Sequence, residues 1–311
     1  MTASAPETAT FAAAAATPTA ATSVATTVRM TKMHGAGNDY VYVDCRERDV
    51  ADPPRLARAV SRRHHGIGAD GLILVRPSDD ADVRMEMYNA DGSRAQMCGN
   101  GIRCVAKFVY ERGLHVNPMR IESDRGVKTL ELAVDAHGRV SGATVDMGAP
   151  VLDGRKIPVA HDDRVVDHPL EVAGATWKVT CVSMGNPHCV LFVPEVESLD
   201  LPRIGPAFER HPFFPERVNT EFVAPRTRRE VDFRVWERGS GETMACGTGA
   251  CAAVVAGVLT GRTDRRALVH LRGGDLDIEW RADDHVYMTG GAAEVFTADV
   301  ELATLYAATG V

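Results

Sequence analysis

The chain of 311 residues lacks a long hydrophobic run, a basic segment and an excess of positive charge. Its longest apolar stretch, ACAAVVAGVL at 250–259, is about half of the roughly 20 residues that a membrane-spanning helix needs. The formal net charge is −7 and the charges are scattered, so the basic face that phosphate binding requires is missing. We therefore expect neither a membrane nor a nucleic acid as a partner.

Cysteine is too scarce for a disulfide framework. The count is seven, which is odd, and two of these cysteines stand in Cys-Gly-x-Gly sequences. This usage indicates a reducing compartment, and the cytoplasm is the expected location. No His/Cys pair has the spacing of a metal site, and the five lysines show no pyridoxal phosphate signature. We expect a site without a cofactor and without a metal.

Residues 1–28 are rich in Ala, Thr and Pro and carry a single charge. They lack both the basic beginning and the Leu/Val-rich core of a secretory signal. We expect a disordered tail with no catalytic part, and an ordered chain that begins at Arg29. The whole chain is 45% hydrophobic and 25% charged, which is typical of a globular protein with a sizeable core.

The chain repeats itself at an interval of 148 residues. The repeated landmarks are the Cys-Gly-x-Gly loops (246 − 98), two Gly-Asn turns (186 − 38) and an aromatic residue in each of two alternating strands (236 − 88). The residues concerned are Cys98 and Cys246, Asn38 and Asn186, and Tyr88 and Trp236. Three landmarks in one order predict two homologous halves rather than a solenoid of short repeats.

Each half shows the same expected order of elements. Two strands flank the Gly-Asn turn, a helix follows near 53–65 or 202–211, and alternating strands lead to the Cys-Gly loop and a second helix. The second helix at 249–261 is apolar almost all round, so it must be buried and strands must surround it. The expected fold class is α+β, with two pseudo-symmetric halves, each a curled mixed β-sheet around a central helix.

The repeat also predicts the domain boundaries. The N-terminal half with Cys98 is expected to comprise residues 29–146 plus 291–304, because the strand-like run at 293–303 can return to complete it. The C-terminal half with Cys246 is expected to comprise residues 147–290.

Both loop cysteines stand at the expected start of a helix. The free N–H groups and the dipole there favour an anion, so we expect lowered thiol pKa values and a bound carboxylate nearby. A sulfur from each half suits the inversion of a stereocentre, in which one thiolate removes the α-proton of an amino acid and the opposite thiol returns one. The N–H groups of Gly99–Asn100 and Gly247–Thr248 would stabilise the charge that develops on the α-carboxylate.

The residues alone leave other functions open. Two converging thiols fit a thiol–disulfide oxidoreductase, although a Cys-x-x-Cys sequence is absent. A non-catalytic amino-acid-binding protein would keep the carboxylate cradle without needing both sulfurs. Each cysteine could also be a buried helix cap, and Asn38 and Asn186 could be ordinary turn residues.

Four segments together resemble the diaminopimelate epimerase family along residues 30 to about 304: NADGSRAQMCGNGIRC, MGNPHC, FPERVN and ERGSGETMACGTGAC. The resemblance implies a cofactor-independent isomerase that interconverts LL- and meso-2,6-diaminopimelate, a small-molecule substrate on the route to lysine and peptidoglycan. Proline and hydroxyproline racemases, the nearest rivals, carry a His where this chain has Asn100. A monomer and a homodimer both stay open.

The resemblance also implies roles for individual residues. Cys98 would act on the LL face and Cys246 on the opposite face, while His188 and Glu237 would tune the ionisation of the thiols. Asn38 and Glu237 would meet the reacting amino group. The reacting carboxylate would lie against Gly99, Asn100, Gly247 and Thr248, and the distal L-centre against Asn89, Asn186, Asn219 and Arg238.

One position departs from a variant of the family. In GIGADGL, Gly71 stands where some members have a glutamine, which leaves open whether position 71 contacts the substrate.

Overall fold

The computed structural model describes residues 27–311. Strand β1 (Thr27–Gly35) begins two residues before Arg29, where we expected order to start. The other residues of the expected tail, 1–26, lie outside the described part of the chain.

The first half of the molecule, as the term is used below, contains β1 to β8 together with the late strand β18. Its elements after β1 are β2 (Asn38–Asp44), α1 (Pro53–Ser61), β3 (Gly71–Arg76), β4 (Val83–Asn89), β5 (Arg94–Ala95), α2 (Gly99–Tyr110), β6 (Met119–Ser123), β7 (Gly126–Val134), β8 (Val140–Asp146) and β18 (Ala293–Glu301). The helix α5 (Leu302–Thr309) ends the chain.

The second half contains the elements from η1 to β17. They are η1 (Gly154–Lys156), β9 (His168–Val172), β10 (Ala175–Ser183), β11 (Pro187–Phe192), α3 (Leu201–Glu209), β12 (Asn219–Thr227), β13 (Glu230–Glu237), β14 (Gly241–Glu242), α4 (Gly247–Leu259), β15 (Arg266–Leu271), β16 (Gly274–Trp280) and β17 (Val286–Gly291).

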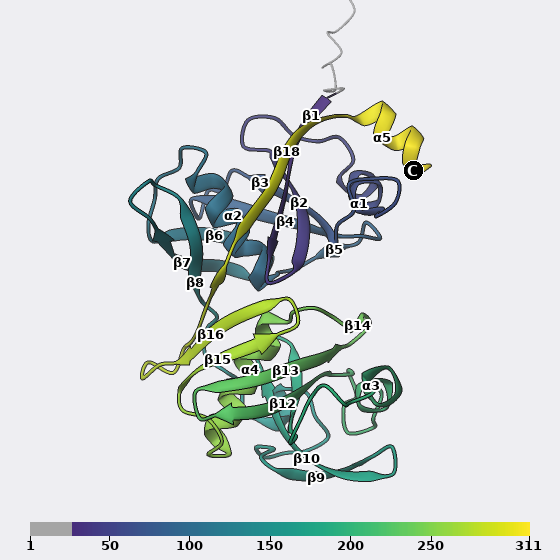
Figure 1. Ribbon diagram of the computed structural model, residues 1–311, viewed down its shortest axis with the longest axis vertical. Coiled ribbons are helices and arrows are strands. Elements are labelled where there is room, and N and C mark those ends of the chain that lie inside the picture. Colours follow the sequence, from purple (N-terminus) through teal and green to yellow (C-terminus); the bar gives the residue numbers. More distant parts are fainter. Residues whose placement is uncertain (1–26) are drawn as a thin grey trace, which may run out of the picture.

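The sequence interval reappears in the element boundaries. The starts of α1 and α3 (201 − 53), of β3 and β12 (219 − 71), of α2 and α4 (247 − 99) and of β7 and β16 (274 − 126) are each 148 residues apart. The two halves therefore repeat one arrangement, and the predicted α+β fold with two pseudo-symmetric halves is confirmed. Figure 1 shows them as two lobes, with β18 running back from the second lobe to lie along β1.

Hydrogen bonds join the strands of both halves into one sheet, whereas we had expected two separate sheets. The link is the antiparallel pairing of β8 with β17, in which Thr144 lies opposite Thr289 and their hydroxyl groups are 2.8 Å apart. Each half is mixed: β2 and β3 pair in parallel, as do the equivalent strands β11 and β12. The sheet curls because every strand pair adds twist.

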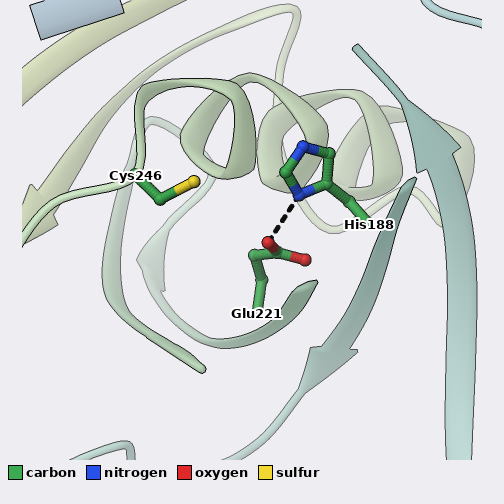
Figure 2. Close-up of side chains that lie close together, drawn as sticks. All are labelled: His188, Glu221 and Cys246. Carbon is green, nitrogen blue, oxygen red and sulfur yellow. Dashed lines mark hydrogen bonds and ion pairs between the residues drawn. The ribbon is translucent and has the colours of Figure 1, made fainter. Parts of the chain in front are cut away.

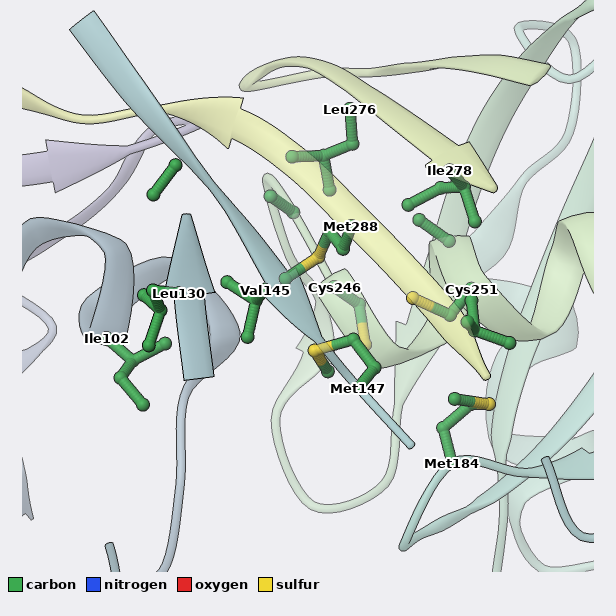
Figure 3. Packing of buried hydrophobic residues seen from close by; sticks show 14 of the residues in the cluster. Ile102, Leu130, Val145, Met147, Met184, Cys246, Cys251, Leu276, Ile278 and Met288 are labelled. Carbon is green, nitrogen blue, oxygen red and sulfur yellow. The ribbon is translucent and has the colours of Figure 1, made fainter. Parts of the chain in front are cut away.

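The two central helices explain how this sheet is filled. Ten residues of α4 are buried and its apolar side chains point in all directions, so it is stable only with strands around it. Helix α2 is the equivalent helix of the first half and also has ten buried residues. One hydrophobic core continues from α2 to α4, and Figure 3 shows Ile102 of α2 and Cys251 of α4 within it.

Three helix details differ from expectation. Helix α1 ends at Ser61 rather than near 65, because the backbone of Arg62 is extended and the chain turns there through a bond from the Gly66 N–H to the Arg62 carbonyl (2.7 Å). Helix α4 begins at Gly247, before the expected 249. Helix α5 was not expected; it packs against α1, with the Arg55 guanidinium 4.0 Å from the Tyr306 ring centre. No helix within residues 27–311 combines the length and apolar character needed to cross a membrane.

The central position of α4 yields a stability prediction. Val254→Ala removes apolar surface from a fully buried site and leaves a cavity, so we expect a loss of about 2–3 kcal/mol in the free energy of unfolding. The same substitution at Val295, which is 54% exposed on β18, should cost about 0.5 kcal/mol or less. Urea denaturation of both variants checks this, and equal losses would contradict the buried position of α4.

Candidate active site

A cleft with a volume of about 1490 Å³ is lined by residues of both halves, including both Cys-Gly loops. Of the candidate site residues, eleven line it: Asn38, Asn89, Cys98, Gly99, Asn100, Asn186, Glu237, Arg238, Cys246, Gly247 and Thr248. His188 and Asn219 do not line it but lie buried behind its wall.

Each loop cysteine is the N-cap of a central helix. Cys98 precedes α2 and Cys246 precedes α4, and both have extended backbones (φ −136° and −124°). The first N–H groups of a helix have no acceptor within the helix, so those of residues 99–100 and 247–248 are available at the cleft. The positive ends of two helix dipoles therefore meet one cavity from different halves.

A single side chain of β17 separates the two helix starts. A β-carbon built at Gly99 would lie 2.7 Å from the terminal methyl of Met288, and one built at Gly247 would lie 2.9 Å from its sulfur. A side chain at either position would therefore displace the end of Met288. Met288, Met147 and Cys246 lie together in the core view of Figure 3. This packing holds the two Cys-Gly loops next to each other at the cleft.

The Cys98 thiol has a polar, partly open environment. It donates a hydrogen bond to the Asn38 side-chain oxygen (3.1 Å) and accepts one from the Gly101 N–H (3.3 Å). Asn38 is fixed in turn because its amide donates to Asp70 (2.7 Å). Burial raises the pKa of the Cys98 thiol, while the Gly101 and Asn100 N–H groups and the charge of Arg103 act in the opposite direction.

The Cys246 thiol has a more buried, acidic environment. Behind it, His188 Nδ1 lies 2.7 Å from Glu221 Oε1 (Figure 2). His188 Nε2 lies 3.0 Å from the Asn186 side-chain oxygen. Burial first, then the nearby Glu237 and Glu221 carboxylates, raise the pKa of the Cys246 thiol well above its ordinary value.

These surroundings correct the expectation that both thiol pKa values are lowered. The helix N-termini do favour the thiolates, but burial disfavours them more strongly, and the carboxylates add to this effect at Cys246. Burial likewise raises the pKa of Glu237, which accepts a hydrogen bond from the Thr243 hydroxyl. Burial therefore shifts all three groups toward their protonated forms.

Of the remaining candidates, Asn89 and Arg238 line the cleft and Asn219 lies behind them. The Asn89 amide donates to the Ser93 hydroxyl (3.0 Å), and Arg238 donates to the Glu216 carbonyl (3.1 Å). Asn219 accepts a hydrogen bond from the Arg238 backbone N–H (2.9 Å) and so fixes that residue from behind.

Gly71 does not line the cleft. A β-carbon at this position would collide with the Tyr88 carbonyl and lie 2.9 Å from the Tyr40 ring. The backbone here therefore has no room for a side chain unless its neighbours shift.

Sequence reasoning missed Glu221, Tyr40 and Arg103. Glu221 is a fully buried acidic residue directly before the apolar residues 222–225 of β12, which is an informative exception. Tyr40 is the counterpart of His188 (188 − 40 = 148) and lines the cleft beside Cys98. Arg103 is fully buried and donates to the Gly99 carbonyl (3.0 Å) and the Asn100 side chain (2.9 Å). A position-by-position comparison of the two halves would have drawn attention to all three.

Comparisons with known proteins agree on one family. A family model described as diaminopimelate epimerase matches residues 30–152 and 180–295. A protein of Acetivibrio thermocellus named diaminopimelate epimerase is 53% identical over 278 residues, which cover 88% of this chain and 99% of that protein. A protein of Moorella thermoacetica with the same name is 55% identical over 275 residues, covering 87% of this chain and 98% of its own length.

Solved structures resemble the chain in fold alone. A hydroxyproline epimerase of Agrobacterium vitis superimposes with a TM-score of 0.65 at 14% identity and covers 89% of this chain and 93% of its own. A PhzF-family phenazine biosynthesis protein of Bacillus anthracis superimposes with a TM-score of 0.62 at 15% identity, covering 88% and 99%.

The raised thiol pKa values predict how the free protein reacts with iodoacetamide. Only the thiolate is alkylated, so modification of Cys98 and Cys246 should be slow at pH 7. The rate should rise about tenfold for each pH unit, and the rise should continue past about pH 8.5, the ordinary thiol pKa. Mass spectrometry of the two peptides between pH 6 and pH 10 measures this, with glutathione as the reference thiol. A plateau reached below pH 8 would contradict the role of burial.

Proposed function

The chain belongs to the diaminopimelate epimerase family and interconverts LL- and meso-2,6-diaminopimelate, and we propose that Cys98 and Cys246 are its two acid–base groups. The observation that carries this proposal is the position of the two thiols: each caps the equivalent helix of its half, and both line one cleft. The same geometry favours a reaction that needs no cofactor.

The stereochemistry requires groups on both faces of the reacting carbon. In the forward direction the Cys98 thiolate removes the α-proton of the LL isomer, and the Cys246 thiol gives its proton to the opposite face. In the reverse direction the two sulfurs exchange roles. A sulfur on each side makes inversion possible without turning the intermediate over.

The two helix starts supply the stabilisation that this chemistry needs. Loss of the α-proton moves negative charge into the carboxylate, which lies against the N–H groups of Gly99, Asn100, Gly247 and Thr248. Donors held in place for developing charge are worth about 100–1000-fold in rate each. The buried Arg103 holds the Gly99 carbonyl and the Asn100 side chain, and so fixes one side of this cradle.

The substrate itself helps to ionise the thiols. Its α-ammonium group is directed by Asn38 and Glu237 to a position beside the two sulfurs. A positive charge there lowers the pKa of a neighbouring thiol, which opposes the effect of burial in the free protein. His188 and its partner Glu221 keep the polar groups behind Cys246 in a fixed arrangement.

Asn89, Asn186 and Arg238 recognise the distal, non-reacting centre of the substrate, and Asn219 holds Arg238 in place. An arginine suits a distal carboxylate because its planar guanidinium can form two parallel hydrogen bonds. This distal contact is what distinguishes diaminopimelate from a simple α-amino acid.

The cellular setting and the functional units belong to the same proposal. All seven cysteines are free thiols, which suits the reducing conditions of the cytoplasm. Residues 29–146 with 291–304 and residues 147–290 act as the two units that present one thiol each. A homodimer stays a prediction.

Replacing either sulfur tests the two-base assignment. Cys98→Ser and Cys246→Ser should each reduce kcat for epimerisation by at least about 100-fold, because a hydroxyl group is a far weaker acid and base at neutral pH. Cys45→Ser, at a buried thiol outside the cleft, is the matched control and should keep its activity. Full activity of both loop variants in reducing buffer would rule the assignment out.

Turnover in heavy water tests proton abstraction separately. Starting from LL-diaminopimelate, the meso product should carry deuterium at the inverted α-carbon, because the proton that the second thiol delivers has exchanged with solvent. Nuclear magnetic resonance and mass spectrometry of the product measure this. A meso product that retains the original hydrogen would exclude the mechanism.

A further inference from the structure

Three side chains at and behind the wall of the cleft form a cluster of potential metal ligands. His188, Glu221 and Cys246 come from β11, β12 and the cap of α4, and one ligand atom of each lies within 4.8 Å of the other two. Figure 2 shows the sulfur, the imidazole ring and the carboxylate turned toward one another. Among residues 27–311 this is the one group of three or more such side chains at that spacing.

The Glu221 carboxylate is incompletely satisfied. Its Oε1 lies 2.7 Å from His188, but its Oε2 is buried and has no hydrogen-bond partner in the described part of the chain. His188 and Glu221 are both fully buried, and a buried carboxylate oxygen without a partner is energetically costly. Glu237 adds a second acidic group close by. A cation at the cluster would offset this excess of acceptors.

The donor set identifies the kind of cation. Imidazole nitrogen, thiolate sulfur and carboxylate oxygen are the ligands of Zn²⁺, whereas Mg²⁺ and Ca²⁺ prefer oxygen alone. A thiolate and a carboxylate together balance a charge of +2. Zinc–ligand distances of about 2.0–2.3 Å place tetrahedral ligand atoms about 3.3–3.7 Å apart. The three atoms lie within 4.8 Å of one another and His188 Nδ1 lies 2.7 Å from Glu221 Oε1, so small side-chain rotations are enough to adjust them.

We propose that His188, Glu221 and Cys246 bind Zn²⁺ or a similar soft divalent cation, and that binding inhibits the protein. On binding, the Cys246 thiol and the His188 nitrogen that meets the metal give up any proton to solvent, a metal–sulfur bond forms, and no oxidant or reductant takes part. The fourth position faces the cleft. Because the metal is bonded to one of the two sulfurs, that sulfur cannot transfer a proton, and epimerisation stops in both directions. This inhibition rests on the proposed function, whereas the metal binding does not.

The pseudo-symmetry provides an internal control. The counterparts of His188 and Glu221 in the first half are Tyr40 (188 − 148) and Ile73 (221 − 148), and neither is a zinc ligand of this type. Cys98 therefore has the same position at a helix start as Cys246 but lacks the two other ligands. Only one of the two thiols is expected to bind the metal.

Titration with Co²⁺, which reports sulfur ligation by its near-ultraviolet charge-transfer band, tests the site in protein freed of any affinity tag. The wild-type protein and Cys98→Ser should both show the band, and Cys246→Ser should lose it. His188→Asn and Glu221→Gln should each weaken binding by at least about tenfold. Mg²⁺ in excess should not compete. Circular dichroism checks that each variant is folded.

Two outcomes would overturn the metal site. One is the absence of the band in the wild-type protein. The other is an equal band in Cys246→Ser, which would point to the buried pair Cys181 and Cys189, cross-strand neighbours in β10 and β11. In a parallel activity assay Zn²⁺ should inhibit, and a chelator should restore activity. Binding through Cys246 without inhibition would refute its catalytic assignment and leave the metal site standing.

Discussion

The antiparallel pairing of β8 with β17 is the contact on which the rest of the structure depends. It joins the strands of two similar halves into one sheet, so that a single core can continue from α2 to α4. It also places Met288 between Gly99 and Gly247, which sets how closely the two helix starts approach. Without this pairing each half would present one thiol at one helix start, and neither half would contain a cleft with two.

The symmetry of the scaffold is broken where the chemistry requires it. The helix starts and their cysteines repeat, but Tyr40 corresponds to His188, Ile73 to Glu221 and Asn89 to Glu237, each 148 residues apart. At these three positions the second half carries a histidine and two carboxylates, whereas the first half carries a tyrosine, an isoleucine and an asparagine. Such a difference suits a substrate whose two ends are related but only one of which reacts.

Burial serves two purposes in this cleft. It raises the pKa of both thiols and of Glu237, and so shifts each of them toward its protonated form. It also strengthens any charge–charge interaction that the substrate brings, because water is largely excluded. The same acceptor-rich surroundings that make Cys246 hard to ionise make its neighbourhood attractive to a soft cation.

The sequence predicted the repeat, the buried central helix and the loop cysteines, because these depend on local patterns: a fixed interval, an apolar helix and a Cys-Gly-x-Gly turn. The resemblance of four segments to one family added the substrate and the remaining candidate residues. The sequence did not predict α5, because its first residues belong to the strand-like run at 293–303. Nor did it predict the end of α1 at Ser61, where a backbone turn stops the helix.

Only the tertiary structure decided how readily the two thiols ionise and which side chains lie behind them. A helix start favours a thiolate by local geometry, which the sequence reveals, but burial is the sum of everything packed around the sulfur, and no local pattern contains it. Glu221 illustrates the same limit, because it lies two residues beyond Asn219 in a strand and meets His188 only when β11 and β12 pair in parallel. The sequence determined which chemical groups the protein carries; the packing of the two halves decided which of them meet and how readily they ionise.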